Sequence, residues 1–329
     1  LSVTDRLIGI AICVPMLWYH FLGGIDIMGY VYAQTISYAL TAAIAFTLVV
    51  SKAGFIKFDW GRTFSIMILK QSFPFAILGM LMAFYNRIDS IMLERLIHDK
   101  GKEAGIYAQA FRLLDATNMV AFLAAGLLLP MFSRMLKFHE SVESLVKTSY
   151  TLLITLAIVV ASGCIFYGHQ IMSMLYIADI DESARVFQIL MCCFLGTVTQ
   201  YIFGTLLTAN GNLRQLNIIA SVGMCLNIIL NFIVIPHLFA IGSAMVSLAT
   251  QLFVPAAQIF VIQRMFKFNM GKLFIKIFVF AAGASVINYF SKMLPFDWRI
   301  SFLCMCGASG VLALLVGLLD VKSLIRVIR

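Results

Sequence analysis

Residues 216–260 read LNIIASVGMCLNIILNFIVIPHLFAIGSAMVSLATQLFVPAAQIF and contain no Asp, Glu, Lys or Arg. The stretch holds two apolar runs, 216–236 and 241–260, on either side of a short interruption. A run of about 20 apolar residues is the length that an α-helix needs to cross ~30 Å of hydrocarbon. We therefore expect two transmembrane helices in this stretch.

The same pattern recurs along the whole chain. Hydrophobic residues make up 62% of the 329 positions and charged residues only 12%, which is more apolar surface than a soluble domain can hide. The sequence predicts an all-α integral membrane protein with about ten transmembrane helices. The apolar runs are 7–22, 29–50, 73–93, 106–132, 149–166, 186–207, 216–236, 241–260, 273–289 and 300–319.

Lys and Arg are distributed unevenly among the segments between these runs. The segments after the second, fourth, sixth and eighth runs carry an excess of Lys and Arg, as does the C-terminal tail, whereas the intervening segments taken together are slightly acidic. Basic residues concentrate on the cytoplasmic side of membrane proteins. The sequence therefore predicts cytoplasmic termini, and its basic balance indicates topology and anionic lipid head groups rather than nucleic acid.

No sequence pattern for catalysis or metal binding stands out. The seven Cys lie in apolar runs, where thiols act as small apolar side chains, and the five His are scattered. Neither the zinc-binding H-E-x-x-H spacing nor a nucleotide-binding P-loop occurs. We therefore expect no catalytic residues, no metal and no cofactor, and we expect a transporter rather than an enzyme.

Polar and ionisable side chains interrupt two of the predicted spans. They are Tyr85, Asn86, Arg87 and Asp89 in 73–93, and Arg112 and Asp115 in 106–132. Such groups are costly inside a bilayer unless they are paired or hydrated. Because the two spans run antiparallel around a turn near residues 100–101, we expect the ion pairs Arg87–Asp115 and Asp89–Arg112. An Arg112–Asp115 pair within one helix is the alternative.

This charge cluster has two interpretations. It locks two helices together, or it lines a hydrated cavity in which an Arg binds an anionic substrate or an Asp couples to ions. Arg suits phosphate because its planar fork of donors meets two oxygens at once. Asn227 and Asn231 lie four residues apart on one helix face, and either bond to other helices or contact substrate. We take all eight residues as candidates for substrate binding or ion coupling.

Two parts of the sequence resemble the polysaccharide-biosynthesis (Wzx-type) flippases. The first comprises FYNRIDSIMLERL at 84–96, AGIYAQAFRLLDATNM at 104–119 and LLLPMFSRM at 127–135. The second comprises LLTANGNLRQLNIIASVGMCLNIILNFIVIP at 206–236 and AIGSAMVSLATQ at 240–251. The likeness covers most of the chain and is firmest over residues 72–263.

The resemblance implies a MATE-like two-bundle fold of the multidrug/oligosaccharidyl-lipid/polysaccharide exporter superfamily, worked by alternating access. It implies translocation of an undecaprenyl-diphosphate-linked oligosaccharide, the repeat unit of O-antigen (in lipopolysaccharide) or of a capsule or exopolysaccharide, across the bacterial cytoplasmic (inner) membrane. The expected partners are this lipid-linked oligosaccharide, membrane lipids, a glycan polymerase and chain-length proteins, with no nucleic acid.

The family has more spans than this chain, so the resemblance implies that much of the N-terminal bundle is missing, as in an N-terminally truncated member. Residues 1–71 are then the last two helices of that bundle and a cytoplasmic interfacial linker. Residues 72–263 are the C-terminal six-helix bundle, and 264–329 are two additional helices. A cation-coupled multidrug exporter of the same superfamily and a membrane-bound glycan polymerase are the alternative functions.

Overall fold

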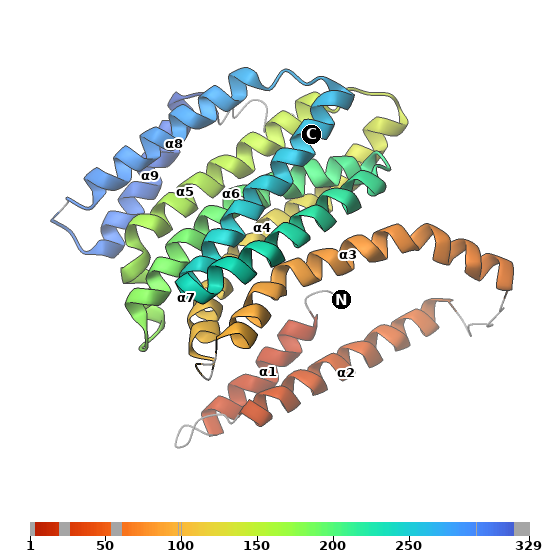
Figure 1. Ribbon diagram of the computed structural model, residues 1–329. Coiled ribbons are helices and arrows are strands. Elements are labelled where there is room, and N and C mark those ends of the chain that lie inside the picture. Colours follow the sequence, from red (N-terminus) through yellow and green to blue (C-terminus); the bar gives the residue numbers. More distant parts are fainter. Residues whose placement is uncertain are drawn as a thin grey trace. The chain divides into compact units, whose positions relative to one another are not determined.

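The computed structural model of the protein describes residues 4–19, 27–53, 61–97, 99, 101–293 and 295–318. Within these residues there are nine helices and no strand (Figure 1). They are α1 (Thr4–Tyr19), α2 (Ile27–Ala53), α3 (Arg62–Leu96), α4 (Lys102–Lys137), α5 (Glu143–Leu175), α6 (Ile180–Ala209), α7 (Leu213–Phe266), α8 (Gly271–Ser291) and α9 (Trp298–Leu315). A helix satisfies its own backbone hydrogen bonds, which lipid cannot do.

The chain divides into two compact units, Leu1–Ile68 and Leu69–Arg329. In the first unit, α1 packs against α2, and a Cβ at Gly9 would lie 3.6 Å from the Ser37 hydroxyl. The division falls within α3, whose first turns belong to the first unit. Residues 62–71, which the sequence placed in an interfacial linker, are helical and part of α3.

In the second unit, α6 is the central helix. It packs against α4, α5 and α7, while α8 and α9 pack against each other and against α5 (Figure 1). On α6, Phe187, Phe194 and Phe203 are at most 2% exposed. By contrast, Phe278 on α8 and Leu315 on α9 are 76% and 79% exposed. Such side chains are suited to a lipid environment, because lipid tails are as apolar as they are.

α7 is a helical hairpin rather than one long span. A straight helix of its 54 residues would be about 80 Å long, far more than a bilayer core of ~30 Å. The helix breaks at Phe239, where φ is 53° and ψ is −137°. The two halves lie side by side, since Asn227 contacts Thr250 and both are nearly equidistant from the break. Beyond the break, the Ala240 N–H donates to Glu103 Oε2 at 3.0 Å.

With α7 counted as two, the described helices make ten helical segments, in agreement with the predicted number. Eight helices are long and apolar enough to cross a membrane. Several helices extend beyond the predicted apolar runs: α3 begins at Arg62 rather than at residue 73, and contains Pro74. The protein is therefore a multi-pass membrane protein whose helices continue past the hydrocarbon-length runs.

The helix connections of the second unit gather at two ends. At one end, Glu143 accepts a hydrogen bond from the Asn269 N–H at 3.1 Å, which joins the α4–α5 connection to the α7–α8 connection. At the other end, Lys102 Nζ lies 3.0 Å from Asp179 Oδ1, which joins the start of α4 to the α5–α6 connection. We call these the Glu143 end and the Asp179 end. The alternation confirms that successive helices run up and down.

We expect Gly196→Ala to destabilise the second unit. The added Cβ would overlap the carbonyl oxygen of Gln251 on α7, so α6 and α7 would have to separate, at a cost of about 1–3 kcal/mol. Thermal unfolding of the purified protein in detergent micelles measures the loss. Gly307→Ala is the matched control, because its Cβ would meet nothing within 4 Å. An unchanged unfolding temperature in Gly196→Ala would contradict the close packing of α6 on α7.

Candidate functional site

A buried carboxylate lies at the junction of four helical segments in the second unit. Asp89 on α3 is only 4% exposed. Its donors are Tyr107 on α4, Asn231 on the first half of α7 and Ser247 on the second half. The Asn231 amide lies 2.6 Å from Oδ1, and the Tyr107 and Ser247 hydroxyls lie 2.9 and 2.5 Å from Oδ2. Three donors therefore converge on one carboxyl group.

Further polar groups extend this cluster toward the Glu143 end. The side-chain amide of Asn231, which already donates to Asp89, also donates to the side-chain oxygen of Asn227 at 3.0 Å. The Tyr85 hydroxyl donates to Thr250 Oγ1 at 2.9 Å, and the Asn227 amide approaches the same oxygen at 3.5 Å. We call these residues the Asp89 cluster: Tyr85, Asp89, Tyr107, Asn227, Asn231, Ser247 and Thr250. Among the residues that the structure describes, Asp89 forms no ion pair.

Hydrogen bonds alone therefore compensate the removal of Asp89 from water. A buried carboxyl group is costly unless its oxygens are hydrogen-bonded, since an unsatisfied buried polar group costs about 1–3 kcal/mol. One acceptor remains unsatisfied, because the Asn231 carbonyl oxygen is buried without a partner among the described residues. The Asp89 cluster thus contains one unsatisfied hydrogen-bond acceptor in a region that is otherwise apolar.

One of the two predicted ion pairs forms. Arg87 Nη2 lies 3.7 Å from Asp115 Oδ2, and the two side chains are 69% and 46% exposed. The Arg87 guanidinium also lies 5.9 Å from the centre of the Phe111 ring. This pair joins α3 to α4 on a more accessible face than that of Asp89.

The predicted pair between Asp89 and Arg112 is wrong. The prediction took into account only the depth of each residue in the hairpin. It did not take into account the direction in which the Arg112 side chain points around its helix. Tyr107, Phe111 and Asp115 are spaced by four and form one stripe of α4, in which the first two rings stack. Arg112 lies about 100° around the helix from Phe111, and its side chain is exposed.

Three of the other four candidate residues, Tyr85, Asn227 and Asn231, belong to the Asp89 cluster. Asn227 and Asn231 are fully buried in the Asp89 cluster. Tyr85 is partly buried and joins the cluster to a neighbouring pocket. Asn86 is in α3, but its side chain lies outside the described part of the structure.

Tyr107, Ser247 and Thr250 were missed as members of the cluster, because single hydroxyls are common in membrane spans. The signal that finds two of them is the position of the break in α7. When residues are paired at equal distance from Phe239, Asn231 is paired with Ser247, and Asn227 is paired with position 251, next to Thr250.

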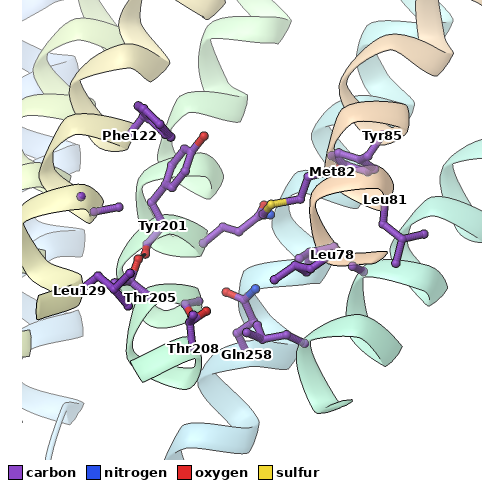
Figure 2. A pocket seen from close by; sticks show the side chains of 17 residues that line it. Leu78, Leu81, Met82, Tyr85, Phe122, Leu129, Tyr201, Thr205, Thr208 and Gln258 are labelled. Carbon is purple, nitrogen blue, oxygen red and sulfur yellow. Dashed lines mark hydrogen bonds between the residues drawn. The ribbon is translucent and has the colours of Figure 1, made fainter. Parts of the chain in front are cut away.

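A pocket of about 270 Å³ lies next to Tyr85, between α3, α4, α6 and both halves of α7 (Figure 2). Its walls are mainly apolar and include Leu78, Met82 and Phe122. Figure 2 shows Met82 extending from α3 across the pocket toward α6. The polar side chains in its lining are Tyr85, Gln200, Tyr201, Thr205, Thr208 and Gln258.

Comparison with known proteins shows similarity to one family and to one solved structure. Residues 1–136 match the family described as polysaccharide biosynthesis protein. Among solved structures, the chain resembles a lipid II flippase, MurJ, in an inward closed conformation, with a TM-score of 0.70. That match has 16% sequence identity and covers 98% of this chain and 67% of the other. No functionally curated protein matches the sequence.

These matches confirm the predicted family resemblance and the predicted fold class. The family match includes the first quoted part of the resemblance, at residues 84–135, and leaves the second part, at 206–251, outside it. At 16% identity the structural match establishes the fold and not the substrate. Within the described residues, no group of three or more His, Cys, Asp or Glu could hold a metal ion.

We expect Asp89→Leu to destabilise the protein strongly. The substitution leaves Tyr107, Asn231 and Ser247 without their acceptor, and each unsatisfied buried group costs about 1–3 kcal/mol. Asp89→Asn keeps the shape and one carbonyl oxygen, so its unfolding temperature should lie between those of Asp89→Leu and the wild type. Thermal unfolding in detergent measures the order, with exposed Arg112→Leu as the near-neutral control. Equal temperatures for Asp89→Leu and the wild type would show that the hydrogen bonds do not hold the bundle.

Proposed function

We propose that the protein moves a lipid-linked glycan across a membrane. The match of residues 1–136 to the polysaccharide-biosynthesis family supports this proposal. The substrate that the family resemblance favours is an undecaprenyl-diphosphate-linked oligosaccharide, an O-antigen or capsule repeat unit. The proposed location is the bacterial cytoplasmic membrane, and the proposed mode is alternating access. Charged diphosphate and sugar groups cross hydrocarbon very slowly unaided, because their desolvation is costly.

The observation that carries this proposal is the accessible Arg87–Asp115 pair, to which α4 adds a second exposed Arg, Arg112. Charge-assisted hydrogen bonds have lengths of about 2.7–2.9 Å, whereas the Arg87–Asp115 distance is 3.7 Å. Arg87 therefore keeps donors available to an incoming anion. Two guanidinium groups on neighbouring helices suit a diphosphate, which can accept two hydrogen bonds from each fork.

We assign ion coupling, rather than substrate contact, to Asp89, Asn227 and Asn231. All three are buried, at 4%, 0% and 0% exposure, so a glycan cannot reach them without rearrangement of the helices. A proton or a small cation could reach the carboxyl group and the unsatisfied Asn231 oxygen. Binding there would compete with the three donors that hold α3, α4 and α7 together. This gives a physical route from an ion to a helix movement.

The proposed orientation has both termini in the cytoplasm. It is supported by the basic residues that gather at the Glu143 end of the second unit. These are Arg134, Lys137, Lys147, Arg214, Arg264, Lys267 and Lys272. The Asp179 end carries a mixture of acidic and basic residues that includes the Lys102–Asp179 pair. A basic end suits the cytoplasmic side, where the glycan lipid is made available for transport.

The alternatives receive less support. A cation-coupled multidrug exporter could also use Asp89 as its coupling residue, but it gives no role to the accessible donors of Arg87, which suit an anionic substrate. A glycan polymerase needs an outer loop that can build an active site. At the Asp179 end of the described structure, the connections are short, and His169 is engaged with Asp181 at 3.0 Å. A polymerase and chain-length proteins remain proposed partners.

We expect Arg87→Ala to reduce glycan export by roughly tenfold or more, since a hydrogen bond to a charged group is worth ~1.5–3 kcal/mol. Arg87→Lys should restore part of the activity, because it keeps the charge and loses the fork. Surface glycan is measured in cells that depend on the tested copy, at matched protein levels. Arg264→Ala, an exposed Arg at the Glu143 end, is the control. Normal export by Arg87→Ala would remove Arg87 from the proposed site.

Aqueous access distinguishes a transporter from a purely structural scaffold. In a cysteine-free variant, we expect Arg87→Cys and Asp115→Cys to react with a membrane-impermeant maleimide, because both positions are accessible. Asp89→Cys should stay unreactive, because this position is 4% exposed. The extent of labelling in sealed vesicles is read by mass shift. If neither of the first two positions reacts, the Arg87–Asp115 pair faces lipid or protein and no hydrated pathway runs past it.

A further inference from the structure

The pocket next to Tyr85 has a lining without charge. None of the residues that line it is Asp, Glu, Lys, Arg or His. The apolar walls include Leu81, Met82 and Phe122. A charged ligand would be desolvated there without compensation. The lining therefore selects an uncharged, mainly apolar ligand, which sets the pocket apart from the Arg87–Asp115 pair.

One buried amide interrupts the apolar lining. Gln258, on the second half of α7, is 3% exposed. Its carbonyl oxygen has no hydrogen-bond partner among the described residues. The amide lies against Gly204 on α6, where a Cβ would be 3.4 Å from Nε2. Figure 2 shows the end of the Gln258 side chain turned toward the pocket between α3 and α6.

A ligand with one neutral polar group would relieve this unsatisfied amide. A buried polar group without a partner costs free energy, and the acceptor here needs a donor. Two hydroxyl groups in the lining already donate hydrogen bonds within α6: Thr205 donates to the Tyr201 carbonyl, and Thr208 donates to the Gly204 carbonyl. Their oxygens remain acceptors. A hydroxyl or amide group of a ligand could donate to these oxygens or to Gln258.

The volume limits the size of the ligand. An apolar cavity of about 150 Å³ holds a benzene molecule. By proportion, the pocket of about 270 Å³ holds roughly ten heavy atoms. This is too small for an oligosaccharide unit, and it matches a short chain or a single ring with substituents.

We propose that this pocket binds an uncharged apolar molecule of about ten heavy atoms that carries one hydroxyl or amide group. Gln258 binds the polar group, and Leu81, Met82 and Phe122 contact the apolar body. The pocket lies beside Tyr85, which reaches Thr250 of the Asp89 cluster. The site does not depend on the proposed glycan transport, and its test does not use transport as a readout.

The test uses a photoreactive diazirine analogue of octanol with the full chain in lipid nanodiscs. Mass spectrometry locates the modified residues after irradiation. We expect saturable labelling of Leu81, Met82 or Phe122 that unlabelled octanol displaces. Gln258→Leu keeps the size of the side chain and removes the amide. It should lower labelling by roughly two- to tenfold, the effect of one neutral hydrogen bond.

Two matched substitutions test whether the label enters the pocket. Gly126 lines the pocket, and a Cβ there would meet nothing within 4 Å, so Gly126→Phe fills the space without a clash at its first atom. Labelling of the pocket residues should be lost. Gly79→Phe is the control, because Gly79 has the same free space and is exposed outside the pocket lining. Labelling that persists in Gly126→Phe would overturn the site.

A second probe tests the polar requirement. The diazirine analogue of octane has the same apolar body and no hydroxyl group. We expect it to label the pocket less than the octanol analogue in the wild type, and equally in Gln258→Leu and the wild type. Gln109→Leu removes another amide with an unsatisfied oxygen, which lies outside the pocket, and should change nothing. Equal labelling by the two probes in the wild type would overturn the role of Gln258.

Discussion

The arrangement of the second unit depends on one carboxyl group that is kept away from water. Asp89 is acceptable at its position only because Tyr107, Asn231 and Ser247 reach it from other helical segments. Between helices in lipid, apolar contact has no hydrophobic driving force, so it selects a helix register only weakly. Buried hydrogen bonds are directional, and leaving one unmade is costly. The Asp89 cluster therefore fixes the position of α3 relative to α4 and to both halves of α7.

The reversal of α7 makes this cluster possible. A chain that crossed and returned through a long loop could still bring two helices together, but the break at Phe239 gives them a nearly fixed register. Backbone with φ 53° and ψ −137° is unfavourable for a residue with a side chain. The bond from the Ala240 N–H to Glu103 helps to hold it. Glu103 and Tyr107 lie one turn apart on α4, so the same helix supports the break and donates to Asp89.

Much of this fold could be predicted from the sequence, because the bilayer imposes a length on each apolar run. The ten segments and their alternation follow from that length alone. The Arg87–Asp115 pair also followed from the hairpin register, because both side chains lie on facing stripes. The prediction of an Asp89–Arg112 pair was wrong, because two residues at equal depth in the membrane can point in different directions around their helices. The hydroxyl donors were missed because single hydroxyls are common in membrane spans. For Ser247 and Thr250, the break at Phe239 also sets the register with the first half of α7.

Arg87 and Asp89 are two residues apart on α3, which directs them about 200° apart around the helix. One side chain is 69% exposed and the other belongs to a residue that is 4% exposed. α3 thus carries an accessible cation on one face and the buried attachment to α4 and α7 on the other. A ligand shifts a conformational equilibrium only by the difference in its affinity for the two states. An anion at Arg87 can therefore move α3 only if it binds more tightly after the bonds to Asp89 are broken. That requirement makes the strength of the Asp89 cluster the threshold that any substrate or coupling ion must exceed.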